Sequence, residues 1–160
     1  MRQILVAVSL ALSASVAVAQ GAPRHTAPHA VIVTPDQVTW GPSPPVLPAG
    51  AKAAVLEGDP KRAGPFTLRV SFPDGYRVPP HFHPVAERVT VIQGTLQLGM
   101  GDKFDESALN SLPAGSYVSM KPGTHHFVQA KGNTIVQING IGPWKLIYLK
   151  PADDPRKATP

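Results

Sequence analysis

The sequence from Gly75 to Gly94 reads GYRVPPHFHPVAERVTVIQG, and it places two histidines and a carboxylate within a short distance of one another. If residues 81–83 are extended, His81 and His83 project from the same face of the strand, with Cα atoms about 6.6 Å apart at roughly 3.3 Å per residue. Both imidazoles can then reach one ion, while the side chain between them points away. The stretch therefore predicts a strand that carries two metal ligands.

A carboxylate follows on the same inward face. Glu87 begins an alternating run in which Val89 and Val91 share its side, so it faces a buried interior. A buried carboxylate needs a partner, and a cation held by two neutral imidazoles provides one. Carboxylate and imidazole together suit first-row metals. These residues predict a metal site formed by His81, His83 and Glu87.

The spacing of five residues in this window resembles the first motif of the cupin superfamily, and all five positions match: Gly75, His81, His83, Glu87 and Gly94. In cupins a second motif supplies one more histidine ligand, shortly after a Pro-x-Gly. Residues 115–126, GSYVSMKPGTHH, are similar to that motif, and Gly115, Gly123 and His126 stand at its positions. The two motifs cover residues 75–130, and the resemblance extends over most of the chain beyond residue 30.

The second motif departs from the family at two positions. Lys121 stands where cupins have proline, and Ala130 stands where they have asparagine. We expect these changes to alter loop geometry and the support of the ligands more than metal binding itself. His126 would share an inward face with Val128 and Ala130, which leaves its neighbour His125 facing outward.

The resemblance implies one divalent metal ion held by four ligands, namely His81, His83, Glu87 and His126. Three imidazoles and a carboxylate could close a tetrahedral zinc site or leave positions open on a six-coordinate ion. Iron, manganese, nickel and zinc all remain candidates. No catalytic acid or base can be assigned from the sequence.

Short apolar runs punctuated by glycine and proline indicate an all-β fold with nine or ten strands, a sandwich or a barrel. The run Phe66–Phe72 alternates strictly and predicts a half-buried strand. Hairpin turns are expected at Gly94 and at Lys131-Gly132, and residues 105–112 contain the only expected helical turn. The cupin resemblance implies a single jelly-roll barrel, and also a homodimer paired through a strand edge.

Residues 1–19 predict a secretory signal peptide, because Arg2 precedes an apolar run that ends in Ala17-Val18-Ala19. The expected domains that follow are a flexible arm over 20–29, the cupin domain over 30–150 and a disordered tail over 151–160. Removal of the signal would leave a secreted or periplasmic protein with no membrane segment. A retained membrane anchor is the alternative.

The amino-acid composition limits which partners and which chemistry are possible. The chain has no cysteine, which excludes thiolate nucleophiles and thiolate metal sites. Its formal net charge is +5, but the basic residues are scattered, so we expect no nucleic-acid partner. A small-molecule ligand is expected, and the positive balance is compatible with an anionic one.

Two functions follow from a metal site in a small barrel. One is a metal-dependent small-molecule enzyme, such as an oxygenase or an isomerase, and the other is a non-catalytic module that binds or senses a small molecule through its metal. Six residues are candidates for lining the cavity, although such residues are often plain core: Phe72, Met100, Tyr117, Gln137, Trp144 and Tyr148.

Overall fold

The computed structural model describes residues 30–157, and the account below concerns the unit that begins at Val31. The predicted signal peptide and flexible arm lie outside the described residues. Strands dominate the described residues, and the helices among them are three short 3₁₀ turns. The strands are β1 (Lys52–Glu57), β2 (Gly64–Phe72), β3 (Arg77–Phe82), β4 (Glu87–Met100), β5 (Asn110–Pro113), β6 (Tyr117–Met120), β7 (His126–Gly142) and β8 (Ile147–Tyr148). The 3₁₀ turns are η1 (Pro35–Gln37), η2 (Glu106–Ala108) and η3 (Pro151–Asp153).

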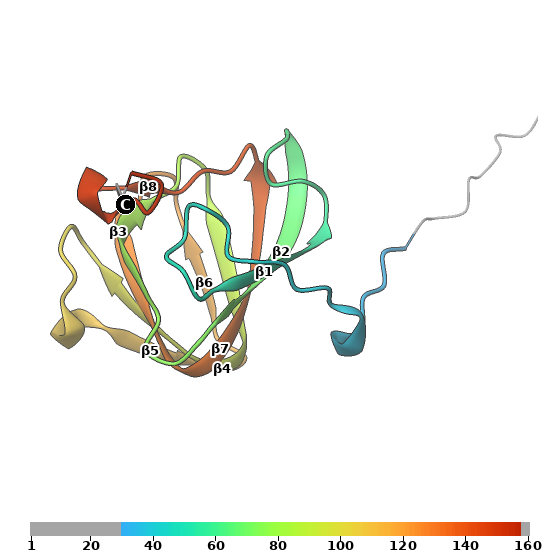
Figure 1. Ribbon diagram of the computed structural model, residues 1–160, viewed down its shortest axis with the longest axis horizontal. Coiled ribbons are helices and arrows are strands. Elements are labelled where there is room, and N and C mark those ends of the chain that lie inside the picture. Colours follow the sequence, from blue (N-terminus) through green and yellow to red (C-terminus); the bar gives the residue numbers. More distant parts are fainter. Residues whose placement is uncertain (1–29, 158–160) are drawn as a thin grey trace, which may run out of the picture. The chain divides into compact units, whose positions relative to one another are not determined.

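All strand pairs are antiparallel, and the strands close into a jelly-roll barrel (Figure 1). Neighbours follow the order β1-β2-β7-β3-β8, while β4 pairs with β5, β6 and β7. The two longest strands, β4 with 14 residues and β7 with 17, run beside each other along most of their length. The predicted all-β jelly-roll fold is confirmed.

The two predicted hairpins are instead bends within long strands. Strand β4 runs through Gly94, and β7 runs through Lys131-Gly132, so residues 30–157 form eight strands. Gly94 has φ +73°, as predicted, and the β4–β7 register shifts just before it, between Val91 and Gln93, and again across it, between Gln93 and Thr95. Glycine with positive φ serves a bulge as well as a turn, and the sequence does not distinguish the two.

The interior is apolar and follows the predicted alternation. Phe66, Leu68, Val70 and Phe72 of β2 are all buried, as their spacing predicted. Strand β2 pairs with the second half of β7, so that Leu68 lies opposite Ile138 and Val70 opposite Val136. The inward side chains of these strands form one wall of the interior.

The ends of the described chain differ from the predictions. The apolar residues 30–33, which open the expected cupin domain, form no strand, and Val31 and Ile32 are exposed. The disordered tail predicted for 151–160 is contradicted over 151–157, where η3 is followed by a buried Asp154 that accepts two hydrogen bonds from the Arg156 guanidinium. The prediction of disorder was wrong here because a polar segment can still form turns that are closed by hydrogen bonds among its own residues. Among residues 30–157, no helix has the length and hydropathy needed to cross a bilayer.

Candidate metal centre

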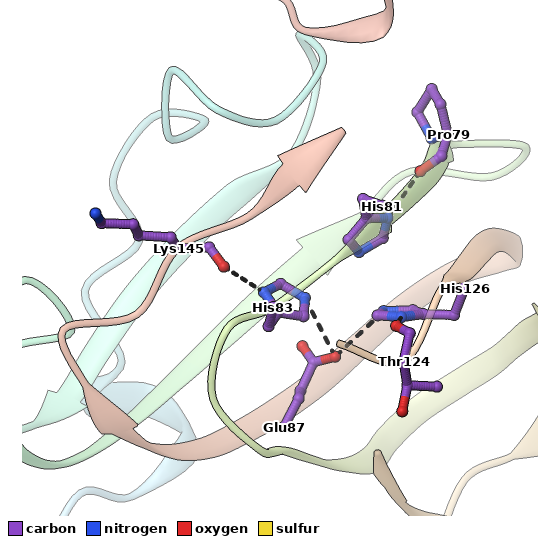
Figure 2. A network of polar contacts seen from close by, with 7 residues as sticks. All are labelled: Pro79, His81, His83, Glu87, Thr124, His126 and Lys145. Atoms are coloured by element: carbon purple, nitrogen blue, oxygen red, sulfur yellow. Dashed lines mark hydrogen bonds and ion pairs between the residues drawn. The ribbon is translucent and has the colours of Figure 1, made fainter. Parts of the chain in front are cut away.

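The four predicted ligands come together from strand ends. His81 lies near the end of β3, His83 follows that strand, Glu87 begins β4 and His126 begins β7. Each is buried, with an exposed fraction of 5% or less. Figure 2 shows the three imidazoles and the carboxylate facing one another in the interior.

A pair of prolines brings two of the histidines side by side. The register between β3 and β7 shifts between Val78 and His81, and the shift falls at Pro79-Pro80. Proline has no backbone N–H to donate to a strand partner, so it is accommodated at such irregularities. The shift places His81 directly opposite His126.

The three histidines each offer one ring nitrogen, and these atoms all lie within 4.8 Å of one another. The Glu87 Oε2 atom lies 3.4 Å from His83 Nε2 and 3.3 Å from His126 Nε2. The carboxylate therefore faces two of the three imidazoles. The three buried histidines could hold a metal ion.

Backbone carbonyls determine which ring nitrogen carries the proton. In each of the three imidazoles, Nδ1 lies within hydrogen-bond distance of a carbonyl oxygen, which can only accept, so Nδ1 donates. The Nε2 atom then keeps its lone pair, the arrangement seen in histidines that bind metals. The carbonyls belong to Pro79 for His81 at 2.7 Å, Lys145 for His83 at 2.7 Å and Thr124 for His126 at 3.0 Å.

Burial keeps two of the imidazoles neutral. Loss of hydration lowers the pKa of His81 well below its usual value, and the neighbouring His126 and His83 lower it further. Burial also lowers the pKa of His83, although Glu87 opposes the change. A neutral His83 with its proton on Nδ1 points an Nε2 lone pair at a carboxylate, and that Nε2 has no hydrogen-bond partner. A cation would be attracted to both groups, so the donor set fits a divalent metal.

Trp144 supports the site in a way that the sequence did not indicate. Its indole stacks on His83, with ring centroids 4.4 Å apart and an interplanar angle of 11°. The sequence marked Trp144 only as a candidate for the cavity wall, because nothing local connects it to a histidine 61 positions earlier.

The four residues line a cavity of about 470 Å³ inside the barrel. Of the six proposed lining residues, Phe72 and Trp144 are confirmed. Met100 and Tyr117 are exposed, the Gln137 side chain accepts a hydrogen bond from Arg69 Nε, and the Tyr148 hydroxyl donates to the Val46 carbonyl. These four do not line the cavity. Gln137 lies on the outward face of β7, between the lining residues Val136 and Ile138.

The second motif is connected to the first through the backbone. The Gly123 N–H donates to the His83 carbonyl at 2.8 Å. Lys121 stands where cupins have proline, and its carbonyl accepts from the Thr124 N–H within the same turn.

Ala130, which stands where cupins have asparagine, is buried, and its N–H donates to the Tyr76 carbonyl. His125 faces outward, as predicted, and lies 2.7 Å from Asp102.

Solved structures share this architecture at low sequence identity. A suggested acetylacetone dioxygenase from Methylibium petroleiphilum PM1 is 20% identical with a TM-score of 0.60, over 81% of this chain and 88% of that one. An RmlC-like cupin protein from Ralstonia eutropha JMP134 is 22% identical with a TM-score of 0.57, over 77% and 74%. KdgF from a Halomonas species is 15% identical with a TM-score of 0.54, over 71% and 96%. These similarities establish the fold.

No curated protein is similar in sequence to this chain. A family model does match, over residues 31–154, and it describes a domain of unknown function, DUF4437. The match covers the barrel, the histidine site and the η3 turn. The chain is thus a member of the DUF4437 family, with the fold of a single-domain cupin.

Proposed function

We propose that His81, His83, Glu87 and His126 hold one divalent metal ion, and that the chain is a metal-dependent enzyme acting on a small molecule, of the oxygenase or isomerase type. The observation that carries the proposal is the unpartnered Nε2 of His83, which faces the Glu87 carboxylate across 3.4 Å in the buried interior. Without a cation, this arrangement places two electron-rich groups together at a cost in free energy.

The protein's contribution is to hold donors and exclude water. The carbonyls of Pro79, Lys145 and Thr124 fix the tautomer and the orientation of the three imidazoles. A bound divalent ion supplies Lewis acidity toward an oxygen atom of the substrate. The apolar wall around the site lowers the local polarity, which strengthens electrostatic interactions there.

The cavity favours an enzyme over a structural metal site. A structural site is closed by its ligands, whereas these four residues line a space of about 470 Å³, within the range of roughly 300–1,000 Å³ for small-molecule sites. The cavity also reaches the exposed residues Asp59 and Lys61, through which a small molecule could enter. Similar folds whose names give an enzyme activity, namely the polyketide cyclase RemF and the suggested acetylacetone dioxygenase, support the class by analogy.

Metal content tests the site itself. Untagged protein should contain about one metal ion per chain by elemental analysis, and His83→Ala should lose most of it. His125→Ala is the matched control, because His125 neighbours a proposed ligand but is directed outward. Equal metal content in wild type and His83→Ala would reject the site.

Turnover tests the enzyme against the binding module. Oxygen consumption by Fe(II)-loaded protein over a small-molecule panel comes first, followed by non-redox reactions with Mn(II), Ni(II) or Zn(II). Turnover that Glu87→Ala abolishes would support the enzyme. Binding without turnover across the panel would favour the non-catalytic module.

A further inference from the structure

The walls of the cavity between the histidine site and its far end are hydrocarbon. Strands β2, β3, β4 and β7 contribute aliphatic side chains, among them Leu68, Val70, Leu96, Leu98, Val136 and Ile138, and Phe72 adds a phenyl ring. All of these are buried. A ligand in contact with this wall gains free energy by burying apolar surface, and it loses free energy for each polar group left unpaired.

Polar groups of the lining lie at two places. One is the buried cluster of His81, His83, Glu87 and His126, beside which the Trp144 indole stacks. The other is the exposed pair Asp59 and Lys61, where the Asp59 carboxylate is already occupied by the Lys61 backbone N–H at 2.8 Å. The remaining side chains that line the cavity are apolar. A sugar or another polyhydroxylated compound would therefore leave several hydroxyl groups without partners.

The dimensions limit the size of the ligand. At about 30 Å³ for each water-sized group, about 470 Å³ accommodates on the order of fifteen non-hydrogen atoms. Val136 lies toward the far end, because it pairs with Val91, which is four residues beyond Glu87 on β4. At about 3.3 Å per residue, that end is roughly 13 Å from the carboxylate. This distance suits a medium-length chain or a compact ring system.

We propose that the ligand is a predominantly hydrocarbon molecule with a single oxygen-bearing head group, such as a medium-chain carboxylate or keto acid. The head lies at the histidine site, which rests on the proposed metal function, and the apolar body extends toward Val136. The apolar body follows from the cavity wall alone and does not depend on the metal.

A homologous series separates these two parts. Straight-chain alkyl hydroxamic acids of two to ten carbons are titrated calorimetrically into zinc-loaded protein and into chelator-treated protein. Affinity should rise about fourfold for each added methylene until the cavity is full, from ~0.8 kcal/mol per buried methylene. Metal removal should weaken every member by a similar factor without changing the dependence on chain length.

The outcomes distinguish the two proposals. No rise with chain length, in either form of the protein, would overturn the apolar-ligand inference even if the metal binds. Affinity could also rise with chain length and be the same before and after chelation. That result would support the apolar-ligand inference and argue against the metal function.

Variants locate the apolar body. Val136→Thr places a hydroxyl without a partner against the far end of the ligand, so affinity for the longest probes should fall about tenfold while two-carbon probes bind as before. Val136→Leu should instead shorten the longest probe that binds by one or two methylenes. This variant tests the same position if the threonine variant folds poorly. Ile92→Thr is the matched control, because Ile92 is 42% exposed and adjoins Val91 on the outward face of β4. Equal effects of Val136→Thr and Ile92→Thr on the long probes would contradict the inference.

Discussion

The indole of Trp144 lies flat against the imidazole of His83, with centroids 4.4 Å apart, and the carbonyl of the next residue, Lys145, accepts the Nδ1–H of the same histidine at 2.7 Å. One short segment thus fixes both the plane and the tautomer of a proposed ligand. The backbone N–H of Trp144 donates to Pro60 at 2.7 Å, which connects this segment to the cavity entrance. Support of this kind sets the position of His83 before any metal binds.

Trp144→Ala should weaken metal binding about tenfold, because the imidazole of His83 loses the surface that orients it. Stability should fall by about 2 kcal/mol, less than the ~3–5 kcal/mol for a fully buried aromatic residue, since Trp144 is only partly buried. Zinc affinity is measured by competition with a chelator, and stability by urea unfolding.

Two controls separate stacking from general damage at Trp144. Trp144→Phe keeps an aromatic face and should recover most of the metal affinity. Tyr117→Ala removes an aromatic side chain that is 61% exposed, and it should change neither quantity. If Trp144→Phe binds zinc as weakly as Trp144→Ala, stacking is not what supports His83.

The period of two along a strand explains which parts of the site were predictable. His81 and His83 were assigned to one face, and both are buried, while Phe82 between them packs against the outward His125 at a centroid distance of 5.4 Å. The inward face of residues 66–72 was predictable for the same reason. Such inferences need only the local pattern and one buried side.

Contacts between segments far apart in the chain could not be predicted from the sequence. The partner of His83 Nδ1 lies 62 residues away, and the partner of the Tyr148 hydroxyl lies 102 residues away. Neither pairing leaves a periodic signal. Gly94 was recognised as a position with positive φ, but its place in a bent strand depends on how β4 crosses β7.

Gly94 and Gly75 offer a matched test of that bend. Both have positive φ, +73° and +70°, so alanine at either should cost about 1–2 kcal/mol in backbone conformation. A Cβ atom at Gly94 would also lie 2.5 Å from the Asn133 carbonyl oxygen, whereas one at Gly75 would meet nothing within 4 Å. Gly94→Ala should therefore cost at least about 3 kcal/mol. The stability of both variants is measured by urea unfolding. Equal losses of stability in the two variants would contradict the close crossing of β4 and β7.

We propose that the protein is exported, on the basis of residues 1–19 alone. Cleavage after Ala19 would remove 19 of the 160 residues and leave 141, beginning at Gln20. The periplasmic fraction of a Gram-negative host should contain a chain of that mass, checked by intact mass spectrometry. Leu10→Arg, which interrupts the apolar run, should abolish processing. A chain that keeps Met1 in the membrane fraction would instead indicate a retained anchor.

Two tyrosines hold the proline-rich segment 44–48 over the cavity. The Tyr76 hydroxyl donates to the Pro48 carbonyl at 2.6 Å, and the Tyr148 hydroxyl donates to the Val46 carbonyl at 2.8 Å. Val46 lines the cavity, so these bonds fix part of its wall. Burial raises the pKa of Tyr76 from 10.0 to about 12 and also raises the pKa of Tyr148.

The raised pKa means that the folded state holds the Tyr76 proton more tightly than the unfolded state does. This contribution to the free energy of unfolding is complete below about pH 10 and is lost as the pH rises toward about 12. Tyr76→Phe should lower stability by about 1 kcal/mol at pH 8, from the lost hydrogen bond. It should also make the alkaline loss of stability shallower than in wild type. Urea unfolding at pH values from 8 to about 11.5 measures both, with Tyr117→Phe as the exposed control. An alkaline slope in Tyr76→Phe equal to that of wild type would show that the Tyr76 hydroxyl does not contribute to holding this segment.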